Sequence, residues 1–237
     1  MEMIDIIGKI RNEFIKNADE KTKTSSQRFF KESIKCYGVK AQIVNKISKD
    51  NFKQLKALTK IEIFELTENF WKSKVLEESL VACNWTYSLR KEFRLDDFEI
   101  FKNWIELYIA NWASCDSFCN HSMGKLIEMY PELLPELKKF TKSENRWMRR
   151  ASAVSLIVPA KKGLFLDTIF EIADKLLFDK DDLVQKGYGW MLKAASQADE
   201  PKVFDYVMKN KSIMPRTALR YAVEKMPQDL RLLAMSK

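Results

Sequence analysis

One stretch of the sequence combines an indole and a carboxylate at a spacing that could serve catalysis. Trp112 and Asp116 lie in FKNWIELYIANWASCDSFCNHSMG, residues 101–124, where one helix is expected to end and another to begin. The two side chains should therefore be presented together at one edge of the fold. A fixed carboxylate there could stabilise a cationic transition state more than the ground state. Alternatively, Asp116 lies in a first helical turn capped by Ser114 and only complements the helix dipole, by about 0.3–1 kcal/mol.

Two later segments add aromatic and cationic side chains. NRWMRRAS contains Trp147, Arg149 and Arg150, and KGYGWMLK contains Trp190 and Lys193. Arginine binds phosphate through two parallel hydrogen bonds, and an indole face attracts cationic groups. The tryptophans could instead be core residues, and the arginines the solvated side of an amphipathic helix. We expect these segments to lie on one face of the fold together with the first stretch.

Other cofactor sites are not expected. Cys115, Cys119 and His121 form a tempting metal cluster, but a structural zinc site takes four ligands and the chain has one histidine. A Cys–His catalytic pair is no better supported, because the two side chains would project from different parts of a helix. Gly187 and Gly189 lack the third glycine and the preceding strand of a dinucleotide site. We therefore predict neither a metal nor a nucleotide cofactor.

Helices must position these residues. With six glycines and six prolines in 237 residues, and apolar residues recurring every three or four positions, the sequence predicts an all-α chain. A second helix is expected over roughly residues 24–37, ended by Gly38 as a left-handed C-cap. Asp96 and Glu99 resemble a capping box that starts a helix with apolar residues nearly all round.

The helices should form one domain. Antiparallel helix pairs recur every ~35–40 residues, a spacing close to that of HEAT-type arrays, and no linker or composition shift divides the chain. We predict a single HEAT-like domain over residues 1–237, built as a superhelical solenoid of stacked antiparallel helix pairs.

Charge and cysteine usage indicate the partner and the compartment. The balance of 41 Lys+Arg against 33 Asp+Glu gives +8, which favours a polyanionic partner. Four scattered cysteines and the lack of a secretory signal predict a protein of the reducing cytoplasm, nucleoid-associated if prokaryotic. Apolar runs such as Val154–Val158 are too short to cross a membrane. We expect a monomer.

NWASCD, NRWMRRAS and KGYGWMLK, in this order in a basic helical chain, resemble the AlkD-like family of DNA alkylation repair glycosylases. The similarity extends from QRFFKESIKCYGVK through YPELLPELKKFTKSENRW to PRTALRYAV. The resemblance implies HEAT-like repeats and a monofunctional glycosylase acting on N3- or N7-alkylated purines in double-stranded DNA. It also implies roles by residue. Asp116 is the catalytic carboxylate, Trp112 and Trp190 form an aromatic cleft against the deoxyribose, and Arg150, rather than Arg149, is the DNA-contacting arginine.

The chain departs from this family at several DNA-binding positions. Lys193 stands where relatives often have arginine, which keeps the charge but loses the bidentate fork. Phe29 stands where the family often has a tyrosine. Lys161 and Lys162, in PAKKG, would replace a phosphate contact in a shifted register, and Trp147 would lie on the same DNA-binding surface. These changes concern lesion range and affinity rather than the chemical step.

The residue types suit hydrolysis of a glycosidic bond. An alkylated purine is cationic and leaves easily, and cationic character then moves to the sugar, where a carboxylate stabilises it. Two alternatives stay open: a non-catalytic helical-repeat protein that binds a protein partner, and a relative that binds DNA structures without excising bases. Affinity for DNA that falls steeply with salt would argue against the protein-binding alternative.

Overall fold

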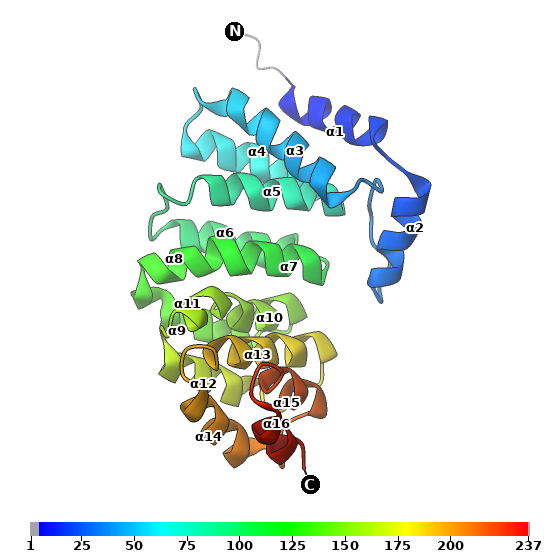
Figure 1. Cartoon of the computed structure of the whole chain (residues 1–237). Helices are drawn as coiled ribbons and strands as arrows, with labels where there is room; N and C mark the ends of the chain where they lie inside the picture. Colours follow the sequence, from blue (N-terminus) through cyan, green and yellow to red (C-terminus); the bar gives the residue numbers. More distant parts are fainter. Residues whose placement is uncertain (1–4, 237) are drawn as a thin grey trace. The chain divides into compact units, whose positions relative to one another are not determined.

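The computed structural model describes residues 5–236, which are helical nearly throughout (Figure 1). The predicted all-α fold is confirmed. Over the described residues, extended pairing is limited to one isolated bridge, between Lys35 and Val75. The chain forms two compact units, Met1–Phe118 and Cys119–Lys237. The single domain over residues 1–237 stays a prediction.

The first unit stacks its helices around an aromatic core. Helix α5 packs against α3, α4 and α7, and the rings of Phe101, Trp104 and Phe118 lie within 6.0 Å of one another. Helix α6 supplies two of these rings, as its nearly all-round apolar sequence predicted. The helices are α1 (Ile6–Lys16), α2 (Glu20–Phe29), α3 (Ala41–Phe52), α4 (Lys60–Ser73), α5 (Leu76–Ser88), α6 (Asp97–Leu107) and α7 (Trp112–Phe118), with a 3-10 turn at Lys53–Leu55.

The second helix is shorter than predicted. Helix α2 ends at Phe29, and residues 30–40 continue in an irregular, largely extended course. Gly38 does have a left-handed backbone, with φ of 88°, but it lies nine residues beyond the helix end rather than at a C-cap. The predicted C-cap is therefore wrong. The backbone of this segment bonds to side chains and backbone of α5 instead of continuing the helix.

The capping box expected at Asp96 is also absent. Asp96 makes no side-chain cap bond, and Asp97 accepts the Arg94 N–H at 2.8 Å instead. A complete capping box starts α4, where Thr59 and Glu62 bond each other's backbone N–H groups.

The second unit is centred on α13, which packs against α10, α11, α12 and α15. Gly189 lets α13 and α15 approach closely, because a Cβ there would lie 2.7 Å from the Ala218 carbonyl oxygen. The last two helices are separated by a short break that ends at Pro227. The helices are α8 (Gly124–Met129), α9 (Leu134–Lys139), α10 (Arg146–Val154), α11 (Ile157–Lys161), α12 (Leu166–Leu176), α13 (Asp182–Ala195), α14 (Glu200–Asn210), α15 (Arg216–Ala222) and α16 (Gln228–Met235), with a π-helical turn at Cys119–Met123 and 3-10 turns at Pro131–Leu133 and Phe140–Lys142.

No helix within residues 5–236 is both long enough and apolar enough to span a membrane.

Candidate functional site

Trp112 and Asp116 lie one helical turn apart on α7. Residues four apart share one face of a helix, and both side chains are partly exposed. Asn111 caps the helix: its Oδ1 accepts the Ser114 N–H at 2.9 Å and the Ser114 hydroxyl at 3.1 Å. The expected cap by Ser114 is therefore wrong. Because α7 begins at Trp112, Asp116 is its fifth residue, beyond the first turn where a carboxylate best complements the dipole.

An aromatic neighbour of Trp112 comes from the segment after α2. The ring of Phe30 stacks on the indole with centroids 5.2 Å apart and planes inclined by 24°. Phe29, one of the residues predicted to contact DNA, is the last residue of α2 and 75% exposed. Phe30 was not among the residues predicted from the sequence, although a second aromatic residue beside Phe29 could have indicated it.

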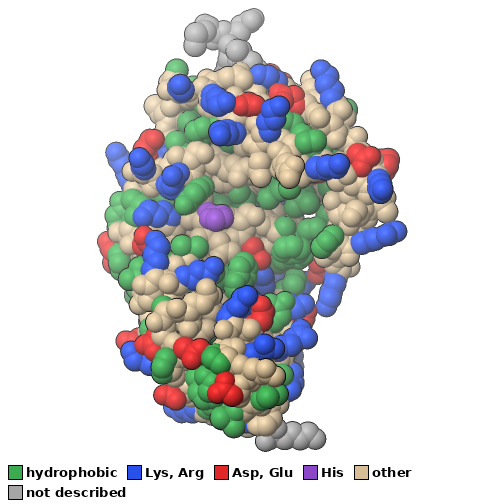
Figure 2. Space-filling model, in the orientation of Figure 1, with side chains coloured by type: hydrophobic (Ala, Val, Ile, Leu, Met, Phe, Trp, Pro, Cys, Tyr) green, Lys and Arg blue, Asp and Glu red, His purple; other side chains and the backbone are tan. Residues whose placement is uncertain are grey.

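The cysteines and the histidine do not gather into a metal site. Cys115 and Cys119 are fully buried, whereas His121 is exposed; its imidazole is visible on the face drawn in Figure 2. In residues 5–236, no group of three or more His, Cys, Asp or Glu side chains is arranged to hold a metal ion.

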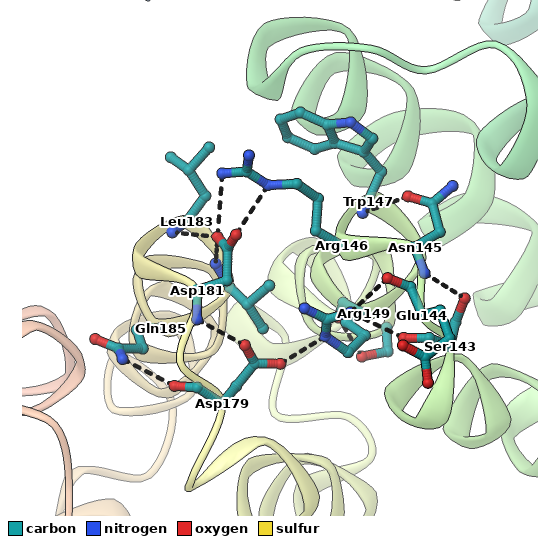
Figure 3. Close-up of polar contacts among 12 residues, drawn as sticks. Ser143, Glu144, Asn145, Arg146, Trp147, Arg149, Asp179, Asp181, Leu183 and Gln185 are labelled. Carbon is teal, nitrogen blue, oxygen red and sulfur yellow. Dashed lines mark hydrogen bonds and ion pairs between the residues drawn. The ribbon is translucent and has the colours of Figure 1, made fainter. Parts of the chain in front are cut away.

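Arg149 and a neighbouring arginine, Arg146, pair with the turn that starts α13 (Figure 3). The Arg149 Nε lies 2.7 Å from Asp179, and its Nη1 donates to the carbonyls of Ser143 and Glu144. The Arg146 Nε lies 2.9 Å from Asp181.

That turn is itself tightly bonded. Asp181 caps α13 by accepting the Leu183 and Val184 N–H groups, and its own N–H donates to Asp179. Gln185 adds a bond to the Asp179 carbonyl at 2.8 Å. The RWMRR sequence thus fastens α10 to α13, which carries Trp190, and this role was not predicted.

Arg150 has an internal partner as well. It is 5% exposed, and its Nη1 donates to the Leu183 carbonyl. Its side chain lies along α13 at Gly187, where a Cβ would approach the Arg150 Cγ to 3.3 Å. Gly187 and Trp190 are three residues apart and so share a helix face. Arg150 therefore lies against α13 one helical turn before Trp190. The contact of Arg150 with DNA stays a prediction.

The remaining predicted DNA-binding residues of the second unit differ in exposure. Trp147 is buried, and the Arg146 guanidinium lies 5.1 Å from its ring centroid. Trp190 is partly exposed. The Lys193 Nζ lies 2.9 Å from Glu224 and 5.2 Å from the Tyr221 ring. Trp147 is thus mainly a core residue, whereas Trp190 keeps an accessible surface.

Lys161 and Lys162 are both exposed near the end of α11. Lys162 pairs with Glu128 at 2.6 Å, and that lysine and its neighbour Lys125 hold the pKa of the Glu128 carboxyl below its usual range. An exposed ion pair of this kind contributes little to stability, so Lys162 can exchange Glu128 for a phosphate at small cost.

Basic residues are spread over the surface rather than gathered in one block. Figure 2 shows Lys and Arg side chains across the whole of the face drawn, with Asp and Glu between them. Given the +8 balance, this pattern is suited to general attraction of a polyanion.

The sequence and the fold both match known proteins. Residues 10–226 match the family described as DNA alkylation repair enzyme. A solved structure described as a predicted DNA alkylation repair enzyme from Enterococcus faecalis has the same fold, with a TM-score of 0.80 and 19% identity. The match covers 90% of this chain and 98% of that chain. Among curated proteins, none matches this sequence significantly.

Proposed function

This chain belongs to the DNA alkylation repair enzyme family, and we propose that it is a monofunctional glycosylase. Its substrate would be a cationic N3- or N7-alkylpurine in double-stranded DNA, and its reaction the hydrolysis of the N-glycosidic bond. The observation that carries the proposal is the pairing of Trp112 and Asp116 on one face of α7, with Asp116 beyond the capped first turn.

Asp116 would act at C1′ of the deoxyribose. The alkylated purine carries a positive charge and leaves as a neutral base, so positive charge develops on the sugar as the bond breaks. A carboxylate held by a rigid helix stabilises that charge without reorganising, and it can orient or deprotonate the attacking water. The indole of Trp112, four residues earlier, would pack against the sugar and hold it by C–H and cation–π contacts.

The other predicted residues would bind DNA. Trp190 is a proposed deoxyribose contact, and Phe29, at 75% exposure, offers a ring without the hydroxyl of a tyrosine. Lys161 and Lys162 are proposed phosphate contacts. A duplex bound through several such contacts loses affinity steeply as salt rises, whereas a protein-binding scaffold would show weak association with DNA that depends little on salt.

Release of free base tests the proposal. The protein is incubated with a duplex containing N7-methylguanine, and liberated base is measured by chromatography. Asp116→Asn should lower the single-turnover rate by roughly 10²–10³ while binding DNA as the wild type does. Asp96→Asn is the matched control. It removes the same charge, and Asp96 is exposed and forms no cap bond. Equal rates for Asp116→Asn and wild type would overturn the role of Asp116. Salt-sensitive DNA binding without any base release would favour the non-catalytic alternative.

A further inference from the structure

Helix α2 and the residues after it are held in place by bonds to α5. None of the residues of α2 is buried, so the helix has no apolar face of its own to fix it. The following segment, residues 30–40, is instead bonded to α5: the Lys35 carbonyl accepts a hydrogen bond from the Leu76 N–H at 2.8 Å. Gly38 closes it onto the start of α2, since a Cβ there would lie 2.7 Å from the Asp19 carbonyl oxygen.

Glu77 provides the main anchor of this segment. Its carboxylate is 3% exposed and accepts three consecutive backbone N–H groups, from Tyr37 at 3.0 Å, Gly38 at 2.8 Å and Val39 at 3.0 Å. Hydrogen bonds from neutral donors to a carboxylate are stronger than neutral pairs. Three of them on one buried side chain fix the course of the backbone at Gly38.

Glu78 secures the same segment from the next position of α5. Its two oxygens accept bonds from the Arg11 guanidinium at 3.1 and 2.9 Å, and the Tyr37 hydroxyl donates to it at 2.7 Å. Two adjacent buried glutamates thus hold one loop through its backbone and one side chain. Burying such charges is costly unless they are fully bonded.

The start of the anchored segment carries the ring that covers Trp112. Phe30 is the C-cap residue of α2 and stacks on the indole at 5.2 Å. Six residues lie between Phe30 and Tyr37, whose N–H is the first one held by Glu77. The Phe30 ring is therefore positioned on the indole by a short segment, residues 30–37, whose C-terminal end is bonded to α5.

We propose that Phe30 and Glu77 are positioning residues for Trp112: Glu77 fixes the 30–40 segment, and Phe30 holds the indole by occupying one of its faces. This rests on the proposed function, in which Trp112 contacts deoxyribose. With one face taken by Phe30, the sugar packs against the opposite face or the edge. The orientation of Trp112 then sets where C1′ lies relative to Asp116, and a shift of about 1 Å in a reacting group can cost a hundredfold in rate.

Kinetics on Phe30 variants test the first part. Phe30 lines an open cavity of about 570 Å³ beside Lys23 and Gln27, so replacing it by a smaller residue leaves the buried core intact. Phe30→Leu removes the ring and should lower the single-turnover rate of base release about tenfold to a hundredfold, with a much smaller change in DNA affinity. Phe30→Tyr keeps the ring and should restore a rate within about threefold of wild type.

Glu77→Gln tests the anchor. The amide offers one acceptor oxygen instead of two and turns an NH₂ toward a backbone N–H. The amides of residues 37–39 should exchange hydrogen faster, and base release should slow to the same degree as in Phe30→Leu. Asp97→Asn is the matched control. Asp97 is also a buried carboxylate of this unit, paired with Lys60 at 2.8 Å, so its loss should destabilise the unit without changing the rate of the folded enzyme.

The outcomes separate the two proposals. Full activity of Phe30→Leu beside an active wild type would overturn the role of Phe30, and rates lowered equally in Asp97→Asn would reduce Glu77 to a structural residue. Unchanged exchange at residues 37–39 in Glu77→Gln would overturn the anchor. If the wild type releases no base, the proposed function fails and the positioning of a catalytic indole fails with it. The exchange pattern then still decides whether Glu77 holds the segment.

Discussion

Gly189→Ala should destabilise the second unit, although alanine is the better helix former. Replacing a helical glycine by alanine normally stabilises by about 1 kcal/mol, through the smaller conformational entropy of the unfolded chain. At Gly189 the added Cβ would lie 2.7 Å from the Ala218 carbonyl oxygen, 2.8 Å from the Tyr221 Cβ and 3.1 Å from the Ala218 Cα. These atoms belong to the backbone and the side-chain base of α15 and cannot turn aside, so α13 and α15 must separate.

Overpacking of this kind costs roughly 1–3 kcal/mol. Because the added Cβ would contact backbone atoms, the cost at Gly189 should lie toward the upper end of this range. After the helix-propensity gain, the net loss should be about 1–2 kcal/mol, which for a chain of this size lowers Tm by roughly 2–8 °C. Thermal unfolding followed by far-UV circular dichroism measures the shift, and the fluorescence of the six tryptophans, Trp190 among them, provides a second measurement.

Gly187→Ala is the matched control, two residues earlier in the same helix. Its Cβ would meet the Arg150 side chain at 3.3 and 3.4 Å and the Val154 Cγ1 at 3.6 Å. These are side-chain atoms that can shift by a few tenths of an ångström. The variant should therefore keep the stability of the wild type or gain up to about 1 kcal/mol. Equal stability of the two alanine variants would refute the claim that Gly189 is required by the close approach of α15.

Three further predictions concern polar contacts. Asp181→Ala should destabilise the protein by about 1 kcal/mol more than Asp181→Asn in urea unfolding, because asparagine keeps the N-cap of α13. Asp97→Asn should cost roughly 3 kcal/mol, since it leaves the Lys60 ammonium, 14% exposed, without its buried partner; an unchanged urea midpoint would contradict this. Burial and the bond to Glu78 raise the pKa of Tyr37 above its usual value of 10, so the stabilisation by the Tyr37 phenol is complete below pH 10 and is lost as the pH rises further. The free energy of unfolding should accordingly fall less above pH 10 in Tyr37→Phe than in wild type.

The fold class followed from the sequence because it depends on periodicity, a local signal repeated over the whole chain. Apolar residues at helical spacing and few breakers were enough to predict the all-α architecture. The prediction of the second helix failed for the opposite reason. The loop that follows its true end at Phe29 is held by Glu77, which bonds the Gly38 N–H from 39 positions away in the sequence. Long-range bonds of this kind leave no periodic trace in the sequence.

The candidate site was predicted unevenly. Trp112 and Asp116 lie beside a predicted helix junction, a local signal that led us to expect the two side chains together at one edge, and the cap of the helix was misassigned to Ser114 instead of Asn111. Phe30 was missed because its stacking on Trp112 joins residues 82 positions apart. The glycines of KGYGWMLK lie inside α13, and their neighbours come from α10 and α15, so their role in helix packing could not be predicted from the sequence of α13.

The arginines of RWMRR show that a positively charged residue in the sequence need not be available to bind phosphate, because it can be paired within the protein. The motif predicted phosphate binding, but Arg149 bonds Asp179, Arg146 bonds Asp181, and Arg150 donates to the Leu183 carbonyl. A phosphate would have to replace these partners, and their loss would loosen the start of α13. Exposed lysines such as Lys161 have no such cost. Within the second unit, the arginines therefore set the position of the helix that carries Trp190, and under the proposed function the attraction of the DNA backbone would fall to the lysines on the surface.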